Sequence, residues 1–240
     1  MEYSLEKAVG KAIVLAVEFP GVKIDRNEFL QKNFSKYFEP SKVNEIINTS
    51  PIEAKVDDKI LNEIAINCIY YEKYKVTLLS AGAGVGGITT VPADMVQYFA
   101  HVFRISQKLA YVYGWPDIFN CGDDIDKTFD EETQKIFFIF MGVMYGVDGA
   151  VSILKELNKC LGEKIAKDLI RQSLTKTVWY PVLKEIAKQL GIKITKKNLS
   201  NFVYKSIPII SGAIAGGMTY YAFSAGAERL HASLKKYPVK

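Results

Sequence analysis

Apolar residues recur every three or four positions along most of the chain, the spacing that predicts one buried face of an α-helix. Alternation with period two is rare, and the best strand candidate is the short run 76–80, so we predict no sheet. In the first part of the chain we predict a helix at 2–18, a second that an Asp25–Glu28 capping box opens, a short third between Pro40 and Ser50, and a long fourth from Asp57 through Tyr71. Further helices are predicted at 92–113, 136–147, 177–190 and 198–204. The expected fold is an all-α, compact multi-helix domain.

Two segments interrupt this pattern because they are rich in glycine and carry no charge. They are residues 76–93 and 206–227. Small residues stand four positions apart in both, so small side chains share one helix face and two helices can approach closely there. We expect the segments either to pack on each other as a central pair of helices or a hairpin, or to insert in a membrane, since about 20 apolar residues span a bilayer. The glycines in these stripes are Gly82, Gly86, Gly87, Gly212, Gly216 and Gly217.

The first glycine segment also contains a literal G-x-G-x-x-G at Gly82, Gly84 and Gly87, the pattern of a dinucleotide-binding turn. Its context argues against that site. The next helix start is postponed to Pro92, no acidic residue follows at the distance that ribose recognition needs, and no βαβ alternation surrounds the motif. We therefore predict no nucleotide cofactor.

The predicted helix 92–113 carries its polar residues on one side. A step of about 100° per residue places them within one narrow arc, with aromatic and aliphatic residues on the other side. The stripe has two interpretations: a solvated face, or the wall of a pocket in which Asp94 and His101 share a ligand. Its members are Asp94, Gln97, His101, Arg104 and Lys108.

Charge is distributed unevenly between the two parts of the chain. Residues 1–149 hold 15 Lys and Arg against 21 Asp and Glu, whereas residues 150–240 hold 16 against 5. The basic second part suits the acidic first part of the same chain or an anionic lipid surface, and we do not expect a nucleic-acid partner. The lysines that would contact lipid head groups are Lys184, Lys188, Lys193, Lys196 and Lys197.

Few residues are available for metal, redox or nucleophilic chemistry. The three cysteines are far apart and odd in number, so they predict no disulfide framework and suit a reducing cytoplasm. The two histidines, His101 and His231, form no metal-binding motif, and the acidic loop after Asp117 lacks the glycine and closing glutamate of a calcium loop. No G-x-S-x-G elbow is present. We predict no metal and nominate no catalytic residue.

Two motifs resemble those of the bacterial EcsC family. PADMVQYFAHVFRISQKLAYVYGWPD at 92–117 follows AGAGVGG, and GIKITKKNLSNFVYKSIPIISGAIAGGMTYYAF stands at 191–223. Thr219 departs from the family pattern, in which Asn commonly precedes the aromatic residue. The resemblance covers roughly residues 57–235. The family takes its name from a gene that accompanies an ABC-transporter operon, and the resemblance implies membrane association. Its most specific positions are Pro92, Asp94, Arg104, Tyr113, Gly114, Pro208, Gly212, Gly216, Gly217 and Tyr220.

These observations leave three functional hypotheses. The first is a cytoplasmic protein, peripheral at the inner face of the membrane, that binds lipid or a membrane protein. The second is an enzyme or small-ligand binder with a pocket around Asp94, His101 and Arg104, to which Gln97, Tyr113 and Tyr220 would belong. The third is a structural or regulatory partner of a transporter that docks through an exposed apolar face of 136–147. We expect an N-terminal helical segment, 1–56, continuous with an EcsC-like domain, 57–240.

Overall fold

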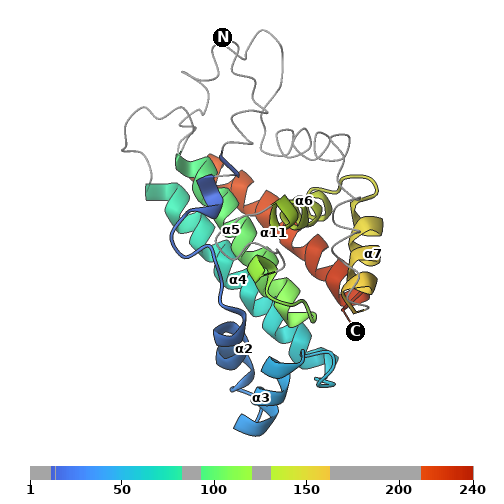
Figure 1. The fold of residues 1–240 in the computed structure, drawn as a ribbon. Coiled ribbons are helices and arrows are strands. Elements are labelled where there is room, and N and C mark those ends of the chain that lie inside the picture. Colours follow the sequence, from blue (N-terminus) through green and yellow to red (C-terminus); the bar gives the residue numbers. More distant parts are fainter. Residues whose placement is uncertain (1–11, 14, 83–92, 121–130, 163–211, 240) are drawn as a thin grey trace.

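The computed structural model describes residues 12, 13, 15–82, 93–120, 131–162 and 212–239 (Figure 1). Helices and turns make up these residues, with no strand among them, so the all-α fold class is confirmed. The helices are α2 (Arg26–Phe34), α3 (Pro40–Asn48), α4 (Asp58–Gly82), α5 (Ala93–Val112), the short η1 (Ile118–Asn120), α6 (Glu131–Met144), α7 (Ala150–Gly162) and α11 (Gly212–Lys236). The helices predicted at 177–190 and 198–204 lie outside the described residues.

Three long helices, α4, α5 and α11, form the main layer of the molecule (Figure 1). Lys235 Nζ, near the end of α11, donates to Asn62 Oδ1 near the start of α4 at 2.8 Å, so these two helices are antiparallel. The rings of Tyr98 and Phe223 meet edge to face, and Tyr113 bonds to His231, so α5 runs in the same direction as α11.

This arrangement brings the described parts of the two glycine-rich segments to one end of the molecule. Gly82 ends α4 and Gly212 begins α11, and both lie at the upper end of the layer in Figure 1, beside the start of α5. The two helices pack against each other more extensively than any other described pair. Helices α4 and α11, which carry the described parts of the two segments, therefore form a packed pair, and Gly86 and Gly87 lie outside the described residues.

A glycine outside the predicted stripes, Gly226, lies where α11 packs closely against the end of α6. A Cβ added at Gly226 would lie 3.3 Å from both the Cβ and the carbonyl oxygen of Met144, so a larger residue would push the helices apart. Arg229 Nη1 donates to the same carbonyl at 3.0 Å, which satisfies an acceptor that the end of α6 leaves open.

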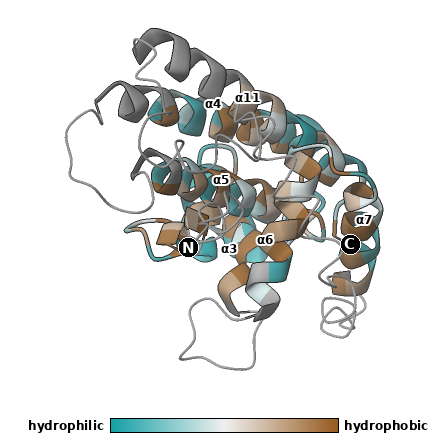
Figure 2. Cartoon of the chain, turned by 90° about the horizontal axis from the view of Figure 1, so that it is seen from above, coloured by the Kyte–Doolittle hydropathy of each residue, from teal (hydrophilic) through white to brown (hydrophobic). Residues whose placement is uncertain are grey.

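Aromatic side chains fill the space between α5, α6 and the turn that follows α5. Trp115 packs edge to face on Phe140, and Phe137 packs against Phe103 with ring centroids 4.5 Å apart. All four are buried, and burying each contributes about 1.5–3 kcal/mol. In Figure 2, α6 and α7 are largely hydrophobic. Because the apolar side chains of α6 are used in this core, the prediction of an exposed docking face at 136–147 is wrong.

The N-terminal part of the chain is tied to the layer by two polar side chains. Gln107 on α5 donates to the carbonyl of Val22 and accepts from the backbone N–H of Ile24, each at 2.9 Å. Arg26 at the start of α2 donates to the carbonyls of Ile47, Thr49 and Trp115. These bonds replace the secondary-structure pairing that the connecting segments lack.

Helix ends and hydropathy agree in part with the sequence predictions. The side chain of Asp25 accepts from the backbone N–H of Glu28 at 2.7 Å, which confirms the predicted N-cap of α2. Helix α5 is described from Ala93, and the predicted helix start at Pro92 lies outside the described residues. No helix in the described part of the chain is both long enough and apolar enough to cross a bilayer.

A pair of glycine variants tests the contact between the turn after α5 and the C-terminal residues. Gly114 has a φ of +96°, and a Cβ there would lie 2.6 Å from the carbonyl oxygen of Val239. Gly146 has a φ of +69° with open space around it. We expect Gly146→Ala to lower the free energy of unfolding by about 1–2 kcal/mol, and Gly114→Ala by at least about 1 kcal/mol more, in urea titrations. Equal losses in the two variants would contradict the close contact.

Candidate functional site

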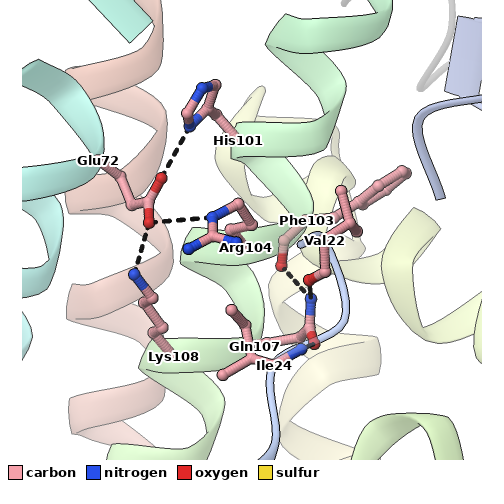
Figure 3. Close-up of polar contacts among 8 residues, drawn as sticks. All are labelled: Val22, Ile24, Glu72, His101, Phe103, Arg104, Gln107 and Lys108. Carbon is pink, nitrogen blue, oxygen red and sulfur yellow. Dashed lines mark hydrogen bonds and ion pairs between the residues drawn. The ribbon is translucent and has the colours of Figure 1, made fainter. Parts of the chain in front are cut away.

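A buried carboxylate on α4 is surrounded by three basic side chains from α5. Glu72 is fully buried. His101 Nδ1 donates to its Oε2 at 2.7 Å, while Arg104 Nε at 3.2 Å and Lys108 Nζ at 2.5 Å donate to its Oε1 (Figure 3). We call Glu72, His101, Arg104 and Lys108 the Glu72 cluster.

The helical period explains how one carboxylate reaches three partners. His101, Arg104 and Lys108 are separated by three and four residues, so they stand in a row on one face of α5. This row is the polar stripe seen in the sequence. It is not a solvated face, because His101 and Lys108 are buried and Arg104 is only 21% exposed. It faces a charge on the neighbouring helix instead.

Electrostatics keep Glu72 ionised. Burial alone would raise its pKa, but the hydrogen bond from His101 and the positive charges of Lys108 and Arg104 outweigh burial and lower the pKa to about 2. An ionised carboxylate only accepts hydrogen bonds, so His101 carries a proton on Nδ1. Glu72 therefore fixes the orientation of the imidazole and its tautomer, as carboxylates do for functional histidines.

Several polar atoms in the row remain open within the described residues. Among these residues Arg104 makes one hydrogen bond, through Nε, so that neither Nη group is bonded within the described part of the chain, and Nε2 of His101 has no partner there. Gln97, one turn before His101 on the same face, is partly buried and makes no hydrogen bond there. The open atoms of Arg104 and His101 are donors and one nitrogen that either donates or accepts, a set suited to an anion, whereas the Gln97 amide offers both a donor and an acceptor.

The structure does not place the other predicted pocket residues at the Glu72 cluster. Tyr113 lies about 18 Å further along the helix axis than His101. Its hydroxyl bonds to Nε2 of His231 at 2.8 Å, so it belongs to the contact of α5 with α11 and not to the Glu72 cluster. Asp94 lies in the first turn of α5 and Tyr220 within α11, and the side chains of both are outside the described set. The five candidate lipid-binding lysines, from Lys184 to Lys197, are also outside it.

Sequence reasoning missed Glu72 itself. The run IYYEKYK around it contains alternating tyrosine, lysine and glutamate, which does not single out one charge. A signal does exist in the spacing: Ala65, Ile69 and Val76 are buried, and position 72 falls in the same apolar series. A glutamate at a core position of a helix requires a basic partner from another element.

The opposite face of α4 exposes large side chains to solvent. Tyr70, Tyr71 and Tyr74 are 69%, 55% and 58% exposed, and Ile66 beside them is 50% exposed. Their spacing of three and four residues places them together on one helix face. Lys75 lies over the ring of Tyr71, with Nζ 4.6 Å from its centroid. We call Ile66, Tyr70, Tyr71 and Tyr74 the tyrosine face.

A separate polar hollow of about 460 Å³ lies between α2, the end of α3 and the turn after α5. Arg26 is at its wall, but its guanidinium already donates to three main-chain carbonyls. None of the predicted site residues lines it. We assign Arg26 a structural role there.

The described residues contain no group of three His, Cys, Asp or Glu that would hold a metal ion. Comparison of the whole chain with models of protein families, with curated proteins and with solved structures gave no match. The resemblance to the EcsC family stays a prediction. The features of α4 that could recognise a partner are the Glu72 cluster and the tyrosine face.

Replacing Glu72 tests the electrostatic account of the cluster. Glu72→Gln leaves Arg104 and Lys108 without an anion, so we expect the free energy of unfolding at neutral pH to fall by about 3 kcal/mol. The control, Glu156→Gln on the exposed side of α7, should change it by less than about 0.5 kcal/mol. Urea unfolding measures both.

The pH dependence gives a second readout of the same variant. The pKa of Glu72 is about 2 in the folded protein against 4.5 ordinarily. Its contribution is therefore complete above pH 4.5 and is lost as the pH falls toward about 2. The difference between wild type and Glu72→Gln should shrink over that interval. A difference that is absent at neutral pH, or constant down to the acid limit, would contradict the assignment.

Proposed function

We propose that this protein binds the surface of an anionic membrane, with the tyrosine face of α4 as the contacting surface. The observation that supports the proposal is the exposure of three neighbouring tyrosines and an isoleucine on one helix face. Single exposed apolar side chains are ordinary, but a contiguous group rimmed by polar residues is typical of an interaction surface.

Tyrosine is suited to the boundary between lipid and water. Its ring is apolar and its hydroxyl stays hydrated, which is why tyrosines gather at membrane interfaces. Lys75 is partly buried at the edge of the tyrosine face, and its long aliphatic stem can pack on the surface while the ammonium lies at head-group level. Each basic residue near an anionic surface adds up to about 1 kcal/mol of attraction.

The position of the tyrosine face agrees with this use. It occupies the part of α4 that leads toward the uncharged last turns, Val76–Gly82. The first part of α11, Gly212–Ala227, also lacks charge and begins at the same end of the molecule (Figure 1). A bundle with uncharged helix ends beside an aromatic face can rest on a bilayer without spanning it.

We also propose that the protein is cytoplasmic and binds peripherally at the inner face of the membrane, where anionic lipids attract basic segments. The basic second part of the chain, with 16 Lys and Arg against 5 Asp and Glu, would add to this attraction. The resemblance to the EcsC family implies the same location. A membrane-protein partner, such as an ABC transporter, is the competing occupant of the tyrosine face.

Vesicle sedimentation with paired tyrosine variants tests the proposal. We expect wild type to pellet with phosphatidylcholine vesicles that contain phosphatidylglycerol. Tyr70→Ser with Tyr74→Ser should weaken binding about tenfold or more, because two ring contacts with lipid are lost. Tyr70→Phe with Tyr74→Phe keeps the rings and should retain most of the affinity. Both tyrosines are exposed, so neither pair should change the melting temperature much.

Two further results would decide against the tyrosine face. Val151→Ser removes an exposed apolar side chain from α7, outside the proposed surface, and should leave vesicle binding unchanged. Loss of binding in Val151→Ser but not in the serine pair would move the contact elsewhere. Absence of wild-type binding to either neutral or anionic vesicles would remove the lipid proposal and leave a protein partner.

A further inference from the structure

We propose that the Glu72 cluster is a binding site for a phosphate group, held by Arg104 and His101. This inference goes beyond membrane association and does not depend on it, since Tyr70 and Tyr74 lie about 200° around α4 from Glu72. Tyr71 borders the cluster, with Lys108 Nζ 5.6 Å from the centroid of its ring. The ligand class is a phosphate monoester or inorganic phosphate. The same chemistry is offered by a lipid head group and by a free ion.

The charges of the cluster are unbalanced. Glu72 supplies one negative charge, whereas Arg104 and Lys108 supply two positive ones before any protonation of His101. Among the described residues, no other carboxylate lies within ion-pairing distance of these two cations. Lys108 is buried against Glu72, so the surplus charge is centred on the more exposed Arg104. A bound anion would neutralise it.

The geometry leaves the right atoms available. Nε of Arg104 is committed to Glu72, and the two Nη groups together keep four N–H donors for a second partner. Nη1 is bordered by Gly21, where a Cβ would lie 3.4 Å from it, an ordinary van der Waals distance, and the Arg104 side chain keeps 21% of its surface exposed. A guanidinium held by one edge and open at the other binds phosphate oxygens through parallel N–H bonds.

His101 completes the recognition. Its Nδ1–H is fixed on Glu72, and Figure 3 shows the other nitrogen on the far side of the ring. His101 and Arg104 are three residues apart on α5, which puts their Cβ atoms about 5–6 Å apart, within reach of one tetrahedral group. Neutral Nε2 accepts from a P–OH group, and protonated Nε2 donates to a phosphate oxygen. A phosphate group can therefore bond to His101 whether the imidazole is neutral or protonated. A carboxylate carries no proton at neutral pH, so it can bond only to the protonated imidazole.

Histidine NMR on the full chain tests this directly, because the chain has only two histidines. Inorganic phosphate is titrated into protein with 15N-labelled imidazoles. We expect the His101 resonances to shift with saturation, while those of His231, whose Nε2 is already bonded to Tyr113, stay in place. Chloride at equal ionic strength is the control for screening.

Variants identify the binding group. Arg104→Gln should weaken phosphate binding at least about tenfold, since it removes the charge and the paired donors. Lys159→Gln, which removes an exposed cation from the last turn of α7, should have no effect. The melting temperature is recorded for each variant. If Arg104→Gln does not fold, the contrast between His101 and His231 in wild type still decides.

A vesicle arm separates the two sources of phosphate. Wild type and Arg104→Gln are sedimented with phosphatidylcholine vesicles that contain phosphatidic acid or, at equal charge, phosphatidylglycerol. A shift of the His101 resonances on addition of inorganic phosphate indicates that the cluster binds the free ion. Preference for phosphatidic acid that Arg104→Gln abolishes, without that shift, indicates a head group. If neither the His101 shift nor the preference for phosphatidic acid is observed, the proposal is overturned. The Tyr70→Ser, Tyr74→Ser pair should still bind inorganic phosphate, so failure of the membrane proposal is distinguishable.

Discussion

The burial of one carboxylate, Glu72, constrains the rest of the structure. A buried charge without partners costs several kcal/mol, so α4 can pack on α5 only in the rotation that presents Glu72 to His101, Arg104 and Lys108. Tyr70 and Tyr74 are each two residues from Glu72, or about 200° around the helix. The ion pairs that bury Glu72 therefore hold the tyrosines outward. One interaction connects the interior of the bundle to the surface we propose for lipid.

The two proposed sites on α4 are consequently adjacent but distinct: Tyr71 borders the cluster, with Lys108 Nζ 5.6 Å from its ring centroid, whereas Tyr70 and Tyr74 lie on the other side of the helix. The cluster lies between α4 and α5, close to the N-terminal segment that Gln107 ties down. The tyrosine face lies outside the bundle. Substitutions of Tyr70 or Tyr74 leave the ion pairs intact, and substitution of Arg104 leaves the tyrosines exposed. Binding of phosphate and binding of a membrane can thus be separated by mutation.

Much of the fold was predictable from the sequence, because helical period, proline and capping signals are local. The N-cap at Asp25 and the polar row on α5 both follow from neighbouring residues. What the row faces is a tertiary property, so the sequence left a solvated face and a ligand pocket as alternatives. Glu72 was missed for the same reason. The docking face predicted at 136–147 failed because a helix that is apolar all round is buried more readily than exposed.

The central claim is that the tyrosine face, turned outward by Glu72, rests on lipid. Fluorine NMR of the full chain with 3-fluorotyrosine at its 14 tyrosines tests it most directly, using anionic vesicles that carry a paramagnetic head group. Single Tyr→Phe variants assign the resonances. The account predicts selective broadening of Tyr70, Tyr71 and Tyr74, while buried Tyr111 and Tyr145 stay sharp. Vesicle-bound protein in which those three tyrosines show no broadening would contradict it.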